Sequence, residues 1–284
     1  MFELIKALIY GIIEGISEWL PISSTGHMIL FEKILPMDVS TEFWNVFLVV
    51  VQLGAIFAVV LLYWKKIFPF AIKKVKNQTK LVVYDHIIVL WLKILVACIP
   101  AAIVGILFDD FLEKYLYNAI VVSAMLVIVG VAFIFIENKN AKKQAKVTSL
   151  SQLSFKDALI IGAFQLIAAI FPGTSRSGAT ILGGLMIGVS RAVASEFTFF
   201  LAIPVMFGAS LLKLLKYVLE FGFAFSMLEL GIIAIGMLSA FIVSIVVIKF
   251  LMSYIKKHDF KVFGYYRIVL GIIVLAFFAI QAIF

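Results

Sequence analysis

Residues 11–30 read GIIEGISEWLPISSTGHMIL, and residues 162–182 read GAFQLIAAIFPGTSRSGATIL. Aligned, the two stretches pair Glu14 with Gln165 and Pro21 with Pro172 at a constant spacing of 151 residues. In each stretch a proline followed by serine, threonine and glycine interrupts an apolar run. Because proline ends or kinks a helix, neither half is long enough to span a bilayer comfortably. The pattern predicts two broken helical pairs, at residues 1–40 and 155–190, each entering the membrane and returning on the same side.

The repeat continues beyond the broken segments. Glu42-Phe43 precedes Gly54-Ala55 by the same interval that separates Glu196-Phe197 from Gly208-Ala209, now at a spacing of 154 residues. The small change in spacing indicates an insertion between the two matches. We therefore expect one membrane domain over residues 1–284, built from a first repeat at 1–140 and a second at 150–284.

The composition requires a bilayer as solvent. Hydrophobic residues make up 64% of the 284 residues and charged residues 14%, with a mean hydropathy of +1.17, far from the values of soluble domains. Cys98 is the only cysteine, which excludes an intramolecular disulfide and a thiolate metal cluster. Apolar runs of spanning length predict six transmembrane helices in an all-α protein, at about 42–64, 86–108, 117–137, 194–216, 227–249 and 264–284.

Loop charge predicts the orientation of these helices. The net charge of +8 comes from lysines in short loops beside apolar segments, where positive charge favours the cytoplasmic side and does not indicate nucleic-acid binding. The basic loops at 65–80, 139–156 and 256–261 should be cytoplasmic, and the acidic segments at 32–42 and 109–113 should face out. Both termini are then outside, and the two repeats have inverted topology. Such repeats place a binding site near the membrane midplane, where the broken helices meet.

Ionisable residues inside apolar segments are functional candidates, because each costs about 2.5 to 3.5 kcal/mol on insertion scales. Glu14 and Glu18 are four positions apart, so they share one face of a helix. A carboxylate pair suits a divalent cation such as magnesium or calcium, or a division of labour between an acid and a base. The alternative is that both are solvated at the interface. The full set of candidates is Glu14, Glu18, His27, Arg176, Arg191 and Glu196.

The first loop concentrates polar chemistry between Pro21 and His27. Ser23, Ser24 and Thr25 supply hydroxyl donors, and backbone amides at a helix start favour phosphate oxygens. Ser24 or His27 could attack phosphorus or relay a proton. The alternative makes the hydroxyls turn and cap residues, with His27 a buried neutral imidazole.

The second loop adds an arginine between Ser175 and Ser177. A guanidinium binds phosphate through two parallel donors and stays charged when buried, which indicates an anion cradle centred on Arg176. The alternative is an interfacial arginine whose head group reaches water. His86 and His258 are interpreted as interface residues without a chemical role.

Together, Glu14-x-x-x-Glu18, Pro-x-Ser-Ser-Thr-Gly-His and Pro-Gly-x-Ser-Arg-Ser-Gly resemble the undecaprenyl pyrophosphate phosphatase family, also called bacitracin resistance proteins. The resemblance covers essentially the whole chain, including Gln52-Leu53-Gly54 and Ser190-Arg191 leading to Ser195-Glu196-Phe197. It implies removal of the terminal phosphate of undecaprenyl diphosphate, recycling of the carrier lipid for cell-wall synthesis, and bacitracin resistance. It also implies a bacterial plasma membrane and a site open to the outer face. The essential positions it carries over are Glu14, Glu18, Ser24, His27 and Arg176, with Ser175 and Thr180 as supporting phosphate contacts.

Several alternatives stay open. The nucleophile is His27 or Ser24, with His27 slightly favoured because imidazole attacks without a base, whereas Ser24 needs a neighbour such as Glu18. A polyprenyl-phosphate transporter or flippase would also have inverted repeats, although pure binding has no need of His27. A lipid phosphatase of the acid-phosphatase-like superfamily would need a second catalytic histidine, which is absent. The oligomeric state is open, and a homodimer is one expectation.

Overall fold

The computed structural model describes residues 1–75, 78–116, 118–222 and 225–283, and within them the protein is almost entirely helical. Residues 117 and 284, the ends of two expected spans, lie outside the described residues. The helices are α1 (Phe2–Ser17), α2 (Ser24–Ile34), α3 (Thr41–Ile67), α4 (Asp85–Leu116), α5 (Ala119–Asn140), α6 (Phe155–Ile170), α7 (Arg176–Met186), α8 (Arg191–Phe221), α9 (Met227–Tyr254) and α10 (Lys261–Ile283). A single 3₁₀ turn, η1 (Leu150–Gln152), precedes α6.

Six of the described helices are long and apolar enough to cross a membrane, namely α3, α4, α5, α8, α9 and α10. This confirms the six spans expected from hydropathy, although α4, α8 and α9 extend several residues beyond the expected ends. Large apolar side chains on their outer surfaces are exposed, among them Leu61, Phe135 and Val246. Exposed apolar surface on this scale is suited to lipid rather than water.

The two broken segments form short helix pairs. Helices α1 and α6 have 16 residues each, and α2 and α7 have 11 residues each. At 1.5 Å per residue, 16 residues reach about 24 Å, less than the hydrocarbon thickness of about 30 Å. Pro21 and Pro172 lie in the two breaks, as expected, within the turns that separate α1 from α2 and α6 from α7.

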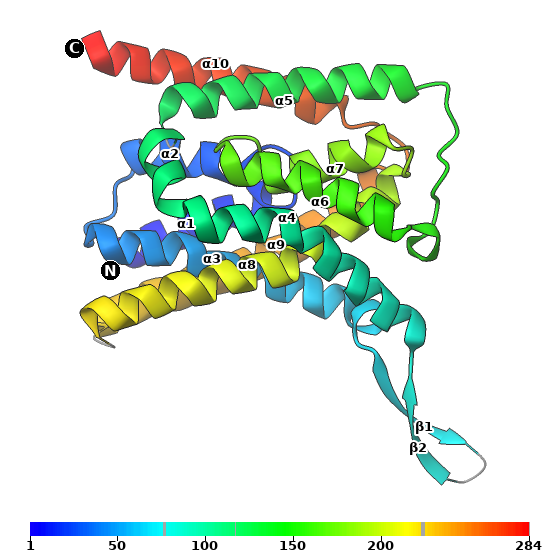
Figure 1. Cartoon of the computed structure of the whole chain (residues 1–284). Coiled ribbons are helices and arrows are strands. Elements are labelled where there is room, and N and C mark those ends of the chain that lie inside the picture. Colours follow the sequence, from blue (N-terminus) through cyan, green and yellow to red (C-terminus); the bar gives the residue numbers. More distant parts are fainter. Residues whose placement is uncertain (76–77, 117, 223–224, 284) are drawn as a thin grey trace.

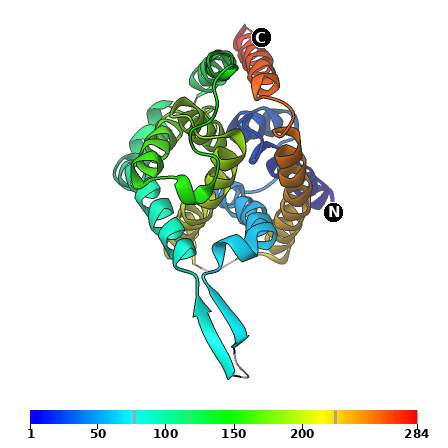
Figure 2. The same ribbon diagram turned by 90° about the vertical axis from the view of Figure 1, so that its right-hand side faces the viewer.

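Tight helix contacts hold the short pairs inside the bundle. On Gly11 of α1, a Cβ atom would lie 2.3 Å from the Gly236 carbonyl oxygen of α9. On Gly162 of α6, a Cβ would lie 2.2 Å from the Ala97 carbonyl oxygen of α4. Glycine is therefore needed at both crossings for the backbones to approach. Helices α5 and α10 lie side by side at one edge of the bundle (Figures 1 and 2).

The hairpin between α3 and α4 departs from the all-α expectation. Strands β1 (Phe70–Val75) and β2 (Gln78–Val83) pair antiparallel, with Phe70 opposite Val83 and Ile72 opposite Leu81. The segment is rich in Val, Ile and Thr, which favour strands, but the sequence interpretation considered only its lysines. The hairpin projects from the bundle beyond the ends of α3 and α4 (Figures 1 and 2).

Candidate functional site

The first loop turns the chain from α1 into α2 around Ser23. The Glu18 N–H donates to the Glu14 carbonyl (3.0 Å), so the helical turn continues and the two acids share one face, as expected. Ser23 is the N-cap of α2, and its hydroxyl accepts from the Gly26 N–H (3.3 Å). Its φ of 73° is rare for a residue with a side chain.

The second loop repeats this geometry at Ser175. That residue caps α7 with a φ of 68°, and its hydroxyl accepts from the Gly178 N–H (3.1 Å). Within the described residues, Ser23 and Ser175 are the only non-glycine residues at positive φ. Such backbone costs about 1 to 3 kcal/mol and persists where the surroundings fix it, frequently at ligand sites.

An ion pair joins the two loops. Arg176 Nη2 donates to Glu18 Oε1 at 2.8 Å, and the side chains of the two residues are only 12% and 8% exposed. The other carboxylate oxygen, Oε2, accepts from the Ser24 hydroxyl at 2.8 Å. Glu18 therefore connects the hydroxyl of one helix start to the guanidinium of the other.

The other atoms of the Arg176 guanidinium show which neighbours hold this side chain in place. Nη1 donates to the Thr198 carbonyl of α8 (3.1 Å), and the guanidinium carbon lies 6.0 Å from the centre of a Trp19 ring. Nε is buried and has no hydrogen-bond partner among the described residues. An unpaired charged donor beside the ion pair is available to an anionic ligand.

Three expected contact residues have hydroxyls occupied within the protein. The Ser177 hydroxyl donates to the Glu18 carbonyl (3.0 Å) and ties the second loop to the first. The Thr180 hydroxyl lies 2.8 Å from that of Thr198, and Ser23 is fully buried in its cap. In this structure these residues support the loops, and only a rearrangement would free their hydroxyls for a ligand.

Four other expected residues reach the surface of the site. Ser24 and Thr25 in the first loop are partly exposed, and so are Ser175 and Arg176 at the matching positions of the second. The Ser175 hydroxyl also lies 3.1 Å from that of Ser177. The accessible part of the site therefore has one guanidinium and three hydroxyls at two helix N-termini, a set of donors suited to an oxyanion.

His27 lies on α2 and is oriented by two contacts. Its Nδ1 lies 2.7 Å from the Ser23 carbonyl, and because a carbonyl only accepts, Nδ1 carries the proton in this bond. Nε2 lies 2.7 Å from the Tyr266 hydroxyl of α10, and the two rings are stacked with centroids 5.7 Å apart. Tyr266 was not identified from the sequence, since nothing in a tyrosine within an apolar helix points to a distant histidine.

Unpaired buried polar atoms gather around the loops. In the described part of the chain they include Glu14 Oε1, Trp19 Nε1, both amide atoms of Gln165, Thr174 Oγ1 and Arg176 Nε, all in the loops or the helices that lead into them. Buried polar groups normally have partners, so such a cluster indicates a place for water, an ion or a ligand.

The unpaired Glu14 Oε1 atom is a candidate ligand for the divalent cation that the sequence analysis expected. Glu14 is 1% exposed and precedes Glu18 by one helical turn. Among the described residues no group of three or more His, Cys, Asp or Glu is close enough to enclose a metal ion. Magnesium, however, commonly takes one or two carboxylates and completes its shell with water and substrate phosphate oxygens. The pair Glu14 and Glu18 fits that mode.

Sequence reasoning missed Arg267, which is completely buried in α10. Its Nη2 donates to the Gly173 and Thr174 carbonyls, each at 2.8 Å, and its Nη1 donates to the Pro21 carbonyl at 3.2 Å. One guanidinium thus holds the backbones of both loops. An arginine inside a spanning segment is itself a signal of function, and that signal was available in the sequence.

Two other candidates from the sequence lie in structural ion pairs. Arg191 donates to Glu137 through Nε and Nη2, and Glu137 also accepts from the Phe260 N–H. Glu196 pairs with Lys66 at 2.7 Å. Among the described residues, neither pair forms a hydrogen bond or ion pair with Glu18, Ser24, His27 or Arg176, so the structure does not bring them into the site.

These features define a polytopic helical membrane protein in which two broken helical segments bring together a candidate site for an anion. The chain belongs to the bacitracin resistance protein BacA family, whose family model matches residues 7–273. Among its relatives, an undecaprenyl-diphosphatase of Desulfitobacterium hafniense is 58% identical, with 100% of this chain and 99% of the relative covered. An undecaprenyl-diphosphatase of Enterococcus faecalis is 56% identical over 98% of each chain, and undecaprenyl-diphosphatase 1 of Clostridium acetobutylicum is 57% identical over 98% of each.

We predict that Arg267→Lys lowers the free energy of unfolding by about 2 to 4 kcal/mol, because an ammonium cannot reach carbonyls in both loops and each buried carbonyl left unpaired costs about 1 to 3 kcal/mol. Thermal unfolding of the purified protein in detergent measures the effect. Arg191→Lys is the matched control, since lysine can still pair with Glu137. Equal, small losses in both variants would contradict the role given to Arg267.

Proposed function

We propose that this protein hydrolyses undecaprenyl diphosphate to undecaprenyl phosphate and inorganic phosphate in a bacterial plasma membrane. The observation that carries the proposal is the Ser24–Glu18–Arg176 chain, which sets a hydroxyl, a carboxylate and a guanidinium beside two helix N-termini. The names of the relatives, all undecaprenyl-diphosphatases, support the same substrate. The undecaprenyl phosphate produced is the carrier lipid that cell-wall synthesis uses again. Faster recycling of this lipid would give bacitracin resistance.

Binding of the diphosphate uses the accessible donors. The Arg176 guanidinium neutralises phosphate charge, and its buried, unpaired Nε becomes a further donor only when the side chain shifts toward the ligand. Hydroxyls of Thr25 and Ser175 and the first amides of α2 and α7 surround the terminal phosphate. Stabilising charge on the phosphoryl oxygens is the main catalytic task in such transfers.

In the first chemical step, Ser24 Oγ attacks the terminal phosphorus while its proton passes to Glu18 Oε2, the acceptor already 2.8 Å away. The bond between that phosphorus and the bridging oxygen breaks, and undecaprenyl phosphate leaves with the electron pair. In the second step, water attacks the phosphorus of the phosphoserine and the bond between phosphorus and Ser24 Oγ breaks. Glu18 returns its proton to Oγ, and the water protons leave with inorganic phosphate. This geometry favours Ser24, whereas the sequence slightly favoured His27.

His27 has a supporting role in this mechanism. Its Nε2 lies 2.7 Å from the Tyr266 hydroxyl. Because this nitrogen is hydrogen-bonded to Tyr266, it is not free to attack the phosphorus of a substrate. From there it orients or protonates groups of the site, and it can serve as a base for water once Tyr266 moves.

A divalent cation, when bound, would be held by Glu14 and Glu18 and would supply charge stabilisation to the phosphate oxygens. Glu14 Oε1, which has no hydrogen-bond partner among the described residues, would then have a cation beside it. The remaining residues keep the roles described above.

We also propose that α1–α5 and α6–α10 are inverted repeats and that α1–α2 and α6–α7 are re-entrant pairs. The matched lengths of the short helices and the similar positive φ values at Ser23 and Ser175 support this, as does the sequence alignment. Loop charge favours a cytoplasmic position for the basic loops, and the resemblance to the family implies a site that is open to the outer face.

Cysteine accessibility tests this topology. In a Cys98→Ala background, Lys33→Cys should react with an impermeant maleimide added outside intact cells, and Lys143→Cys should react only after the membrane is permeabilised. Both residues are exposed or partly exposed at helix ends, so burial does not limit labelling. Labelling of both from the same side would contradict the proposed orientation.

Turnover tests the function itself. Purified protein should release phosphate from undecaprenyl diphosphate, and Arg176→Lys should reduce kcat by at least about 100-fold, because lysine is a point charge without a planar fork of donors. Arg191→Lys should stay near the wild-type rate. If the protein bound the diphosphate lipid tightly but released no phosphate, a lipid transporter would be the better interpretation.

Rapid quenching tests the nucleophile. With terminally labelled diphosphate lipid, we expect acid-stable protein-bound phosphate that disappears in Ser24→Ala, because phosphoserine survives acid. Acid-labile label that disappears in His27→Ala would assign the attack to His27, since phosphohistidine is acid-labile. An absence of label in both experiments would favour direct attack by water.

A further inference from the structure

A hollow lies between α3 and α9, at the ends of these helices that adjoin the basic loops. Its volume is about 310 Å³, and its polar lining consists of Tyr63, Lys249, Ser253 and Lys256. Leu62, Ile248 and Met252 form the apolar part. None of the residues assigned above to phosphate binding or turnover lines it, so the hollow is separate from the candidate active site.

A break in α3 accompanies the hollow. Tyr63 has non-helical backbone angles, φ −113° and ψ 16°, inside an otherwise continuous helix. Its ring packs edge-on against Phe200 of α8 (5.3 Å between centroids). Further along the same pair of helices, the backbones approach so closely that a Cβ on Gly54 would lie 2.1 Å from the Met237 carbonyl oxygen. The hollow is therefore located where a tight helix contact gives way to a kink.

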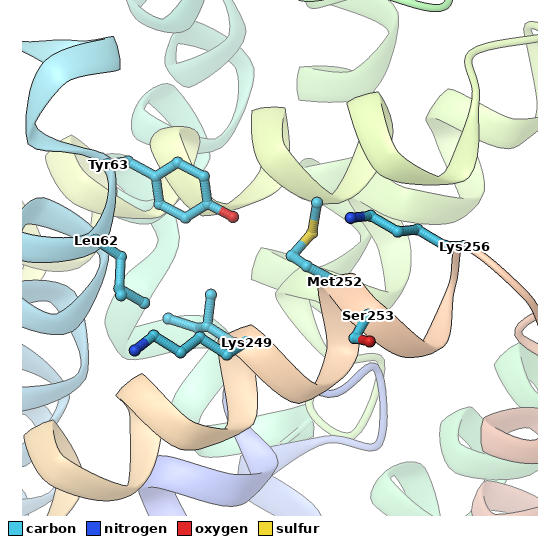
Figure 3. A pocket seen from close by; sticks show the side chains of 7 residues that line it. Leu62, Tyr63, Lys249, Met252, Ser253 and Lys256 are labelled. Atoms are coloured by element: carbon cyan, nitrogen blue, oxygen red, sulfur yellow. The ribbon is translucent and has the colours of Figure 1, made fainter.

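Two positive charges border the hollow without an acidic partner. Lys249 and Ser253 occupy positions i and i+4 of α9, and Lys256 follows in the turn just after the helix ends at Tyr254. Among the described residues neither lysine is in an ion pair, and the nearby Glu196 is engaged by Lys66 at 2.7 Å. In Figure 3 the Tyr63 hydroxyl and the Lys256 ammonium point toward each other across the opening.

The surroundings place the hollow at the level of lipid head groups. Trp64, next to Tyr63, stacks on Phe68 with centroids 4.4 Å apart and is 49% exposed, as expected of an aromatic residue at a membrane interface. Leu61 and Phe250, which adjoin lining residues in the chain, are 59% and 53% exposed. A ligand here meets cations and hydroxyls at one end and lipid-facing apolar surface at the other.

We propose that this hollow binds the phosphate head group of an anionic phospholipid from the leaflet beside the basic loops. The two ammonium groups neutralise the phosphate, and the Tyr63 and Ser253 hydroxyls donate hydrogen bonds to its oxygens. The acyl chains then lie along the exposed apolar side of α3 and α9. Basic pockets between membrane helices on the cytoplasmic side commonly bind lipid head groups in this way.

Native mass spectrometry of the full chain in detergent tests the proposal. Phosphatidylglycerol, phosphatidylcholine and inorganic phosphate are titrated separately, and phosphatidylglycerol should bind most tightly. The double variant Lys249→Gln/Lys256→Gln should weaken phosphatidylglycerol binding by about 30-fold, the equivalent of about 1 kcal/mol per lysine. Lys142→Gln/Lys143→Gln removes the same charge from an exposed loop at the same end and should leave the affinity unchanged.

Undiminished phosphatidylglycerol binding in the Lys249→Gln/Lys256→Gln variant would overturn the proposal, and so would an equal loss in the control. Tighter binding of inorganic phosphate than of phosphatidylglycerol would overturn the lipid assignment and make free phosphate the ligand. Tyr63→Phe removes only a hydroxyl and keeps the ring packing, so it should weaken binding measurably even if the double variant folds poorly.

Discussion

Glu18 and Arg176 come from loops 158 residues apart in the chain, and each neutralises the buried charge of the other. Inside a membrane protein an unpaired charge of either sign is costly, and removing one partner of a buried pair typically costs about 3 to 5 kcal/mol. The ion pair therefore forces the two loops to meet. Once they meet, the Ser24 hydroxyl finds its acceptor on the same carboxylate.

The backbone around this pair is held from several directions. Arg267 donates to carbonyls of both loops, and the Ser177 hydroxyl donates from the second loop to the carbonyl of Glu18. The capping serines have the same uncommon φ in each loop. This redundancy keeps a strained backbone in place, so that the amides at the starts of α2 and α7 stay oriented for an anion. Preorganised donors of this kind need no rearrangement when charge develops on a phosphate.

Much of the architecture could be predicted from local features. Pro21 and Pro172 break their segments wherever the rest of the chain goes, and apolar runs of spanning length define the six long helices independently of tertiary contacts. The residues that were predicted to act together, Glu18, Ser24 and Arg176, do form one hydrogen-bonded chain. Their residue types, in and beside two repeated loops, contained that information.

The rest depends on contacts between distant residues. The partners of Arg267 are carbonyls, which every residue has, so no sequence pattern identifies them. Tyr266 contacts His27 across 239 residues, and Ser177 and Thr180 could have donated to a ligand but instead donate within the loops. The β1–β2 hairpin was not predicted for another reason. The lysines of this segment were used only to predict the orientation of the helices, and its strand-forming Val, Ile and Thr residues were not considered.

A double-mutant cycle on Glu18 and Arg176 tests the central claim, that these two side chains join the loops. The free energy of unfolding is measured in detergent for Glu18→Gln, Arg176→Gln and the double variant. Each single change should be strongly destabilising and the double variant should lose less than their sum, with a coupling of about 1 to 3 kcal/mol. Losses that add to within about 0.5 kcal/mol would show that the loops do not meet through this pair.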